Sequence, residues 1–505
     1  MSKKIRKQEY DKKYEFEEYN IKTIPKFYTS DECKTFIQNF PDDVGKLIDY
    51  PIITDYNKLT EIILSGITQE DDIENPIKLP DKFDKIIENI QIKKSIYLPN
   101  NPLKDRILNT LHYLYYHMRC GIYCRIENNQ VKQFIIFVNP DYTNNWSKYL
   151  TFEGENGNIV NDKQYYHYKR KYYRRENVIP LNKWWCNGHM FDNELGQTLW
   201  GQHLVTSIVD MLYFLTTTKK VKNKSFFINK RDYPQLRADL TEPYEFLFPK
   251  KTQIPSKYIG KGFIPIYSFF SSNTFADVLI PSTDDWDTAT GLIPLSDNPS
   301  DKYADSNYYK YKNIKWDDKK PYAFFRGSGT GGPTIESNQR FMLAKLSNEL
   351  NDKSILDAGV VTWNIRDKKI SSDKPVTFPK KDKLGFSLAQ FVPMSEQMKI
   401  KYIIYVDGHC AAARYIYLMK MKVLILKIES IRPETADLWF FPLLENMVDH
   451  VSVKPDLSDL VEKIKWCQSH DRECKKIAKN AYKKYKKYLN KNMILDYFAY
   501  VINEI

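Results

Sequence analysis

The second half of the chain alternates short apolar runs with amphipathic segments. The apolar runs have the length and the β-branched or aromatic character of buried strands. The expected strands are YAFF (322–325), SILDA (354–358), IKYIIYV (400–406), KVLILKI (422–428) and HVSVK (450–454). The expected helices are 337–350, 410–420 and 457–469, the last with Asp456 as its N-cap, and two more helices follow. Near-continuous apolar strands separated by helices predict a parallel sheet covered on both faces.

The first half has a weaker pattern that still predicts several elements. Residues 109–121 have helical periodicity, and 121–138 predict a hairpin that turns at Glu127-Asn128-Asn129. Further expected elements are a helix over 202–216, a strand at SFFIN (225–229) and a strand at ADVLIP (276–281). Residues 141–185 are expected to be loops, and residues 1 to about 90 are polar, lysine-rich and without an assignable pattern.

Length and charge narrow the classes of protein. A chain of 505 residues is too long for one core, so two or three domains are expected. The net charge of +13 favours an anionic partner, which can be nucleic acid, a membrane surface or a nucleotide sugar. The seven cysteines are scattered and form no CxxC pair, which indicates reduced thiols and no zinc site.

Targeting signals are not found in the sequence. The N-terminal segment is charged throughout, and no run of 18 apolar residues occurs, so neither a signal peptide nor a transmembrane segment is expected. The last residues, VINEI, are not an endoplasmic-reticulum retention signal. These observations favour a cytoplasmic location.

A glycine-rich stretch follows the first strand of the second half. In AFFRGSGTGG (323–332), Gly327, Gly329 and Gly332 form a G-x-G-x-x-G string, which is typical of dinucleotide-binding turns. Pro333 delays the next helix, so an ordinary glycine-rich turn is an equally good interpretation. A strand end with Arg326, free main-chain N–H groups and the Ser328 hydroxyl can in either case hold an anion.

A second strand end has a similar composition. After the strand that ends at Val406, Gly408 makes a turn and three alanines are expected to open a helix. A helix N-terminus offers free N–H groups to a diphosphate, and Arg414 can bind phosphate oxygens bidentately. The alanines alone would indicate close packing of a helix under a sheet, but their combination with Gly408 and Arg414 favours a ligand site.

A third strand end has a candidate general base. NKRDYPQ (229–235) follows the strand SFFIN, and ligands in open α/β sheets bind at the carboxyl ends of strands. Asp232 can therefore act as a base. From these residues alone, a carboxylate that stabilises the turn before Pro234 is the better interpretation.

Five motifs together resemble one known family. NKRDYPQ (229–235), SFFSSNTFADVLIP (268–281), FRGSGTG (325–331), YIIYVDGHCAAAR (402–414) and VDHVSVKPDLSDL (448–460) occur in the order of the glycosyltransferase family 90 signature. The chain is thus similar to protein O-glucosyltransferases and to capsule-associated xylosyltransferase-like proteins. The likeness covers about 225–490, extends more weakly from about 100, and does not include the first 90 residues.

The resemblance implies an α/β fold of the GT-B type, with two Rossmann-like domains that face each other across a cleft. The implied domains are an unassigned N-terminal region (1–90), an acceptor and base domain (91–310), a UDP-sugar domain (311–490) and a terminal helix (491–505) that packs back on the first domain. The implied reaction is metal-independent, inverting O-glycosylation that moves glucose or xylose from UDP-glucose or UDP-xylose to a hydroxyl of a protein or glycan. No cofactor is implied, because the UDP-sugar is a substrate.

The resemblance also implies roles for particular residues. Asp232 takes the position of the catalytic base. The donor-binding positions are Arg326, Gly327, Ser328, Arg340, His409, Cys410, Ala411, Ala412, Ala413 and Arg414. Ser328 and Arg340 lie 12 positions apart, farther than the corresponding Ser and Arg of protein O-glucosyltransferases. No metal ligand is implied, and the D-x-D string of Asp285 and Asp287 is interpreted as a chance occurrence in an acidic loop.

Two other functions remain open from the sequence. A dinucleotide-dependent oxidoreductase would use the glycine-rich turn and an acidic residue near Asp357. A nucleic-acid-binding protein would use the basic and aromatic stretches 165–176 and 481–492, although solvated surfaces explain these stretches better and no stable nucleic-acid partner is expected.

Overall fold

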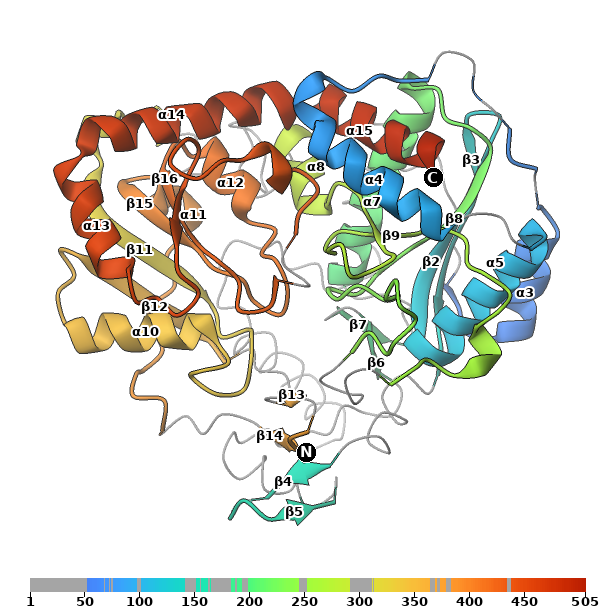
Figure 1. Cartoon of the computed structure of the whole chain (residues 1–505), viewed down its shortest axis with the longest axis horizontal. Helices are drawn as coiled ribbons and strands as arrows, with labels where there is room; N and C mark the ends of the chain where they lie inside the picture. The colour runs from blue at the N-terminus through green and yellow to red at the C-terminus, as the bar shows by residue number, and fades with distance from the viewer. Residues whose placement is uncertain are drawn as a thin grey trace, which may run out of the picture.

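The structure is a computed structural model (Figure 1). It describes residues 52–97, 101–140, 151–161, 164, 183–186, 189–192, 199–244, 252–290, 311, 313–363, 368–369, 373–377, 383–433 and 437–505, without residues 68, 72, 74, 75 and 155. The stretch 165–176, one of the two basic and aromatic segments, lies outside the described residues.

The second half of the chain contains a five-stranded sheet with the order β12-β11-β15-β16-β17, and every pair in it is parallel. Its strands are β11 (Lys320–Ser328), β12 (Leu356–Thr362), β15 (Ile400–Tyr405), β16 (Leu424–Ile428) and β17 (Val451–Val453). The helices that follow them are α10 (Gln339–Leu350), α12 (Tyr415–Lys420), α13 (Leu460–Ser469) and α14 (Asp471–Tyr488). The predicted parallel sheet is confirmed.

Both faces of this sheet are buried, as the continuous apolar strands predict. Phe325 and Ile404 pack with side chains of α10, α13 and α14 in one cluster. Their strand neighbours Phe324 and Ile403 pack in another cluster, which includes α12. Successive side chains of a strand point to opposite faces, so a strand covered on both faces needs apolar residues at every position.

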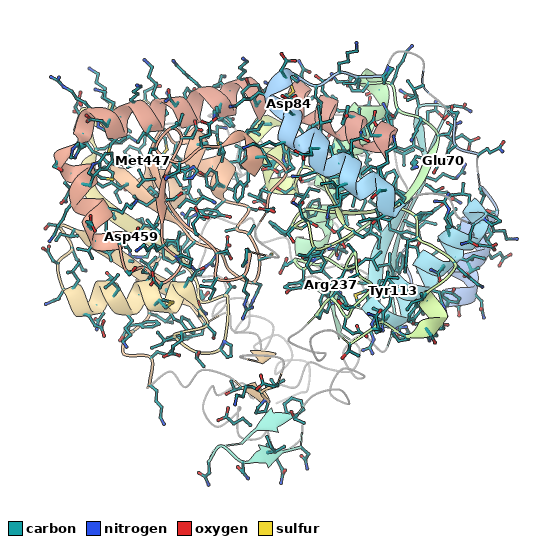
Figure 2. All side chains as sticks on the ribbon, in the orientation of Figure 1. Glu70, Asp84, Tyr113, Arg237, Met447 and Asp459 are labelled. Carbon is teal, nitrogen blue, oxygen red and sulfur yellow. The ribbon has the colours of Figure 1, made fainter. Side chains whose placement is uncertain are left out.

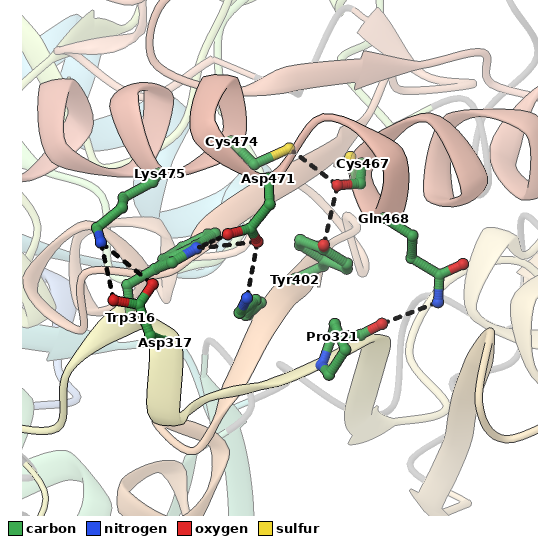
Figure 3. Close-up of polar contacts among 10 residues, drawn as sticks. Trp316, Asp317, Pro321, Tyr402, Cys467, Gln468, Asp471, Cys474 and Lys475 are labelled. Atoms are coloured by element: carbon green, nitrogen blue, oxygen red, sulfur yellow. Dashed lines mark hydrogen bonds and ion pairs between the residues drawn. The ribbon is translucent and has the colours of Figure 1, made fainter.

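Hydrogen bonds connect the amino-terminal ends of the sheet's strands to the region where α13 ends and α14 begins (Figure 3). Asp471 accepts hydrogen bonds from the Trp316 indole N–H and from Lys401 Nζ, at 3.0 and 2.7 Å. Tyr402 donates to the Cys467 carbonyl oxygen at 3.0 Å, and Gln468 donates to the Pro321 carbonyl oxygen at 2.8 Å. Polar contacts therefore hold the amino-terminal ends of the strands in place, and the carboxyl ends lie on the opposite side of the sheet.

The start of α13 differs from its prediction. Asp459, not Asp456, occupies the N-cap position, and the helix begins at Leu460. Leu457 has a φ of 63°, in the left-handed region, and a residue in that conformation cannot continue a right-handed helix. Asp456 instead accepts hydrogen bonds from the main-chain N–H and the hydroxyl of Ser458, at 3.0 and 2.8 Å.

The first half of the chain contains a six-stranded mixed sheet with the order β1-β3-β2-β8-β9-β10. Its strands are β1 (Ile52–Ile53), β2 (Cys120–Glu127), β3 (Gln130–Val138), β8 (Lys224–Ile228), β9 (Ile266–Ser268) and β10 (Val278–Leu279). The predicted hairpin is confirmed as β2 and β3, and Asn128 and Asn129 at its turn have φ of 50° and 59°. Asparagine tolerates this conformation better than most residues do, which explains both residues at the turn.

The helices of the first half include the predicted ones. They are α3 (Tyr56–Leu64), α4 (Asp84–Ile96), α5 (Leu103–His112), the π-helical turn η2 (Tyr113–Met118), α7 (Leu199–Thr218) and α8 (Thr283–Thr290). The helices predicted over 109–121 and 202–216 correspond to α5 with η2 and to α7. The strand predicted over 276–281 is shorter and consists of β10 alone.

The segment without a predicted pattern contributes to the core of the first half. Leu59, Phe83, Ile86 and Ile90 are buried in the same cluster as the strands β2, β8 and β9. Residue 90, where the sequence suggested a boundary, lies inside α4. The segment is polar on average, but these buried side chains make it part of the core.

The helix α15 (Lys491–Glu504) lies near α4 and α7, beside the first half of the chain (Figure 1). Tyr497 donates to the Leu279 carbonyl oxygen at 2.7 Å, and the rings of Phe498 and Tyr267 are 6.3 Å apart. Trp439 stacks on Tyr497 with ring centroids 4.3 Å apart. The contacts of Tyr497 with Leu279 and of Phe498 with Tyr267 join segments that lie more than 200 residues apart in the sequence.

Candidate active site

Two of the predicted donor segments meet at the switch point of the parallel sheet. After β11 the chain proceeds to β12 on one side, and after β15 it proceeds to β16 on the other side. Ligands in open α/β sheets bind at the carboxyl ends of the strands where this reversal occurs. Residues 329–338 and 406–414, which follow β11 and β15, leave the sheet at that point.

Arg340 joins the two strand ends. From the first turn of α10, its guanidinium donates to the carbonyl oxygens of Ser328, Asp407 and Val406, at 2.9, 2.9 and 3.2 Å. Arg340 is 8% exposed, and burial lowers its pKa to about 10, so it stays charged at neutral pH. Ser328 and Arg340 are therefore in direct contact, although 12 positions separate them in the sequence.

Arg414 adds a second positive charge close to Arg340. It donates to the Arg326 carbonyl oxygen at 2.8 Å and to the Gln397 side-chain oxygen at 2.9 Å. Burial and, to a lesser extent, repulsion by Arg340 lower its pKa to about 10. Both guanidinium groups lie within 6 Å of the Phe325 ring centre, at 5.8 and 5.9 Å. Two cations over one ring produce a positive potential at the switch point, which suits a polyanion.

The guanidinium group of Arg326 is bound within the chain. Its guanidinium forms an ion pair with Asp357 at 2.8 Å and also donates to the Gln390 carbonyl oxygen at 3.2 Å. The charge that the sequence analysis assigned to anion binding is therefore paired with Asp357 on the neighbouring strand β12. The main-chain oxygen of Arg326 accepts a hydrogen bond from Arg414 and so helps to position that side chain.

The glycine-rich stretch is part strand and part tight loop. Gly327 and Ser328 belong to β11, so the strand is longer than predicted. A Cβ on Gly332 would lie 2.2 Å from the Ser337 carbonyl oxygen, so only glycine fits there. The Asn338 side chain accepts from the N–H groups of Arg340 and Phe341, at 3.1 and 3.3 Å, and caps α10. Those N–H groups are therefore satisfied within the chain.

The segment 407–414 is a turn and not the start of a helix. The prediction of a helix from Cys410 is wrong, because α12 begins at Tyr415. Gly408 N–H donates to the Cys410 carbonyl oxygen at 2.9 Å, and Ala412 N–H donates to the Tyr405 hydroxyl at 2.8 Å. A short helix after the turn leaves the anion-binding role to side chains and single N–H groups of the turn.

The two loops touch each other at Gly408. A Cβ on this residue would lie 2.5 Å from the Thr330 hydroxyl oxygen and 3.1 Å from Arg340 Nη2. His409, Cys410 and Ala411 are buried, and Ala412 and Ala413 are half-buried. The structure thus brings together Ser328, Arg340 and the 408–414 turn among the predicted donor positions.

The candidate base Asp232 lies in a rigid turn after β8. Asp232 is half-buried, while its neighbours Arg231 and Tyr233 are buried. The Asn229 side chain accepts from Arg231 N–H at 2.7 Å and donates to the Tyr233 carbonyl oxygen at 2.8 Å. These two bonds close the turn around Asp232.

Neighbouring elements hold the same turn from outside. The Arg231 guanidinium donates to the Met118 carbonyl oxygen at the end of η2, at 2.6 and 3.1 Å. The Tyr113 hydroxyl donates to the Gln235 carbonyl oxygen at 2.6 Å. Tyr113 and Arg237 mark this region in Figure 2. Asp232 is therefore presented on a backbone with little freedom.

The D-x-D string is part of the helix α8 and not of a loop, so the sequence-based placement is wrong. Asp285 accepts from the Ser282 N–H at 2.8 Å and from the Trp439 indole N–H at 3.1 Å, and Asp287 accepts from the Ser207 hydroxyl at 2.9 Å. Both carboxylates are buried and stabilise packing. Within the described ranges, no group of three or more His, Cys, Asp or Glu side chains could hold a metal ion.

Several polar residues of the site were missed by the sequence analysis. Asp407 lies beside Arg340, and burial raises its pKa to about 6. Gln397 binds Arg414, and Asp277 binds the turn after Asp232. Asp407 and Asp277 both stand within quoted motifs, so their position next to predicted site residues was the available signal. Gln397 gave no signal in the sequence.

The similarity to known proteins decides the family. A sequence profile described as "Glycosyl transferase family 90" matches residues 197–505, which is more than half of the chain. The chain belongs to glycosyl transferase family 90. The family's match includes Asp232, both strand ends at the switch point, and α15.

Relatives across the family include viral and animal proteins. "Uncharacterized protein 179R" of Invertebrate iridescent virus 6 is 30% identical over 88% of this chain and 42% of its own length. "Uncharacterized protein 035R" of Invertebrate iridescent virus 3 is 30% identical over 78% of this chain and 36% of its own length. Human "Protein O-glucosyltransferase 3" is 29% identical over 58% of this chain and 48% of its own length. The chain thus spans less than half the length of these relatives.

The helices of the structure were also considered as membrane spans. No helix in the part of the chain that the structure describes is long and apolar enough to cross a bilayer.

Proposed function

We propose that this family 90 member is an inverting glycosyltransferase that moves glucose or xylose from a UDP-sugar to a hydroxyl of a protein serine or threonine, or of a glycan. The observation that carries the proposal is the convergence of Ser328, Arg340 and Arg414 at the switch point of a parallel sheet. Relatives named protein O-glucosyltransferase support the sugar-transfer chemistry. The proposed fold is GT-B, with the mixed sheet and the parallel sheet in its two domains.

The proposed donor site is the switch point of the second sheet. The diphosphate of UDP lies near Arg340 and Arg414, whose guanidinium groups donate hydrogen bonds to main-chain carbonyl groups. The charge that develops on the departing UDP is then stabilised without reorganisation of the protein. These two arginines supply the positive charge that other glycosyltransferases obtain from a metal, so the proposed reaction is metal-independent.

The proposed base is Asp232. Its carboxylate takes the proton of the acceptor hydroxyl while the acceptor oxygen forms a bond to the anomeric carbon. The bond between that carbon and the phosphate oxygen breaks, and the electron pair leaves with UDP. Attack on the face opposite the leaving group inverts the anomeric centre. The rigid turn of residues 229–235 serves this step because a base must be held in line with the reacting atoms.

The binding test uses calorimetry and thermal unfolding with UDP, UDP-glucose, UDP-xylose, GDP, NAD and FAD, each with EDTA and with Mn²⁺. Stabilisation by UDP and one UDP-sugar in EDTA is the expected result. Stabilisation by NAD or FAD alone would favour an oxidoreductase, and stabilisation only with Mn²⁺ would contradict a metal-independent site.

The catalytic test is the substitution Asp232→Asn. We expect kcat for UDP release with hydroxyl acceptors to fall by about 10²- to 10⁴-fold, because an amide cannot take the proton. The affinity for UDP is expected to stay unchanged. Asp239→Asn is the matched control, since the Asp239 side chain is 58% exposed and lies in the next turn. Near-normal turnover of Asp232→Asn would show that another group is the base.

The two alternative functions have less support in the structure. In the oxidoreductase interpretation, an acidic residue ends the second strand of the unit, but β12 ends at Thr362 and Asp357 is paired with Arg326. In the nucleic-acid interpretation, aromatic faces near 481–492 would stack on bases, but Tyr485 and Tyr488 are buried.

A further inference from the structure

One buried carboxylate clamps the turn that carries Asp232. Asp277 lies just before β10 and is fully buried. Its Oδ1 accepts from Gln235 N–H at 2.8 Å, and its Oδ2 accepts from Leu236 N–H at 2.7 Å. The Ser268 hydroxyl donates to Oδ1 at 2.6 Å. A carboxylate that accepts from two successive main-chain N–H groups fixes the direction of the backbone there.

The main chain beside this clamp is paired as well. Ala276 N–H donates to the Leu236 carbonyl oxygen at 2.7 Å, and Ala238 N–H donates to the Thr274 carbonyl oxygen at 3.0 Å. The segment after Asp232 therefore runs against the segment before Asp277. Asp277 occupies the end of this pairing, at the point nearest to the turn.

The segment that contains Asp277 is itself supported by α4. Lys93 donates to the Ser272 carbonyl oxygen at 2.6 Å and also to that of Phe275. The Tyr97 hydroxyl donates to the Ala276 carbonyl oxygen at 3.0 Å. A chain of contacts thus runs from α4 through Asp277 to the turn that contains Asp232.

We propose that Asp277 is a positioning residue for the transfer reaction, which fixes the turn of residues 229–235 so that Asp232 meets the acceptor hydroxyl in line. The proposal rests on the proposed role of Asp232 as the base. Asp277 acts through the backbone of Gln235 and Leu236 and does not touch the reacting atoms. The charge on Asp277 is needed because both of its oxygens accept from N–H donors.

The substitution Asp277→Asn tests this proposal. It replaces one acceptor oxygen by an NH₂ group that opposes a main-chain N–H, so the clamp opens on one side. We expect kcat for UDP release to fall by about tenfold to 100-fold, as a displacement of about 1 Å can cause. The donor KM and the UDP affinity are expected to stay within about twofold, because the donor site lies on the other sheet.

A purely structural role of Asp277 would give another pattern. In that case kcat, UDP affinity and the midpoint of denaturant unfolding would fall together, and the proposal would be overturned. A kcat within about twofold of the unsubstituted protein, with Asp232→Asn inactive, would overturn it as well. An active Asp232→Asn would contradict the proposed base directly, so the two failures can be told apart. Asp239→Asn again serves as the control.

Hydrogen exchange provides a test that does not depend on the stability of the variant. In the unsubstituted protein, the N–H groups of Gln235 and Leu236 are expected to exchange at least tenfold more slowly than unprotected amides. Asp277→Asn, where it folds, should raise the exchange rate in the peptide 229–238 and leave the peptides of β11 and β15 unchanged. Unprotected exchange at Gln235 and Leu236 in the unsubstituted protein would overturn the clamp.

Discussion

At the scale of single residues, Arg340 is a buried cation that is bound by main-chain carbonyl groups. It donates to three carbonyl groups at the ends of β11 and β15. A buried cation with this geometry holds the two strand ends together. Under the proposed function, stability and donor binding are therefore coupled in one residue.

We expect Arg340→Ala to lower the free energy of unfolding by about 2–4 kcal/mol, because three buried carbonyl groups lose a charged donor. UDP affinity is expected to fall in calorimetry at a temperature where the variant is folded. Lys345→Ala on the same helix is the control, since the side chain of Lys345 is 42% exposed. A change of less than about 0.5 kcal/mol for Arg340→Ala would contradict the bridging role.

Single residues also show the limit of sequence analysis. Asp232, Ser328 and Arg414 were proposed as site residues because each follows an expected apolar strand and lies in a motif of the family resemblance, and their roles stay predictions. The partner of Arg326 was missed because Asp357 is a neighbour only through the pairing of β11 with β12. Contacts that depend on strand order have no local signal in one sequence.

At the scale of elements, α8 connects the two halves of the molecule. Its Asp285 accepts from Trp439, and its Asp284 accepts from the Tyr417 hydroxyl at 2.8 Å. Burial raises the pKa of Asp285 to about 7. Its Oδ1 is buried without a hydrogen-bond partner among the described residues, which favours the neutral, protonated form of the carboxyl group.

The pH dependence of stability follows from this shift. In the unfolded chain Asp285 titrates near 3.9, so between pH 4 and 7 the folded state binds more protons and stability falls as pH rises. Asp285→Asn removes this dependence. We expect the stability of this variant relative to the unsubstituted protein to rise by about 1–2 kcal/mol from pH 5 to pH 8, measured by urea unfolding. A pH-independent difference would contradict the shift, and a loss of transfer that Mn²⁺ reverses would indicate a metal site.

Among the elements, strongly periodic ones were predictable and their ends were not. The strands β11, β15 and β16 and the helix α7 correspond to their apolar patterns. The start of α12 was predicted five residues too early, because small residues after Gly408 resemble a helix start while hydrogen bonds within the turn prevent one. The segment 52–97 was missed because charged and polar residues stand between its apolar residues, several of which are fully buried.

At the scale of the whole molecule, α15 packs on segments that lie more than 200 residues earlier in the chain. Trp439 and Tyr497 are each 1% exposed and stack with their planes 18° apart. The domain boundaries expected from the sequence stay a prediction.

We expect Tyr497→Ala to lower the free energy of unfolding by about 3–5 kcal/mol, because a large buried ring is lost. Tyr497→Phe keeps the stack on Trp439 and loses only the hydrogen bond to Leu279, so a loss of about 1 kcal/mol is expected. Denaturant unfolding of both variants measures the difference. Equal losses would show that the hydroxyl group, and not the ring, is the important part.

The placement of α15 has a consequence for synthesis of the protein on the ribosome. About 200 residues separate α8 from α15, and at about 5–20 residues per second they take about 10–40 s to translate. During that time the faces of α4, α7 and α8 that α15 covers remain exposed to solvent. The nascent first half is thus expected to need a chaperone, or slow collapse, until the chain that covers it has emerged.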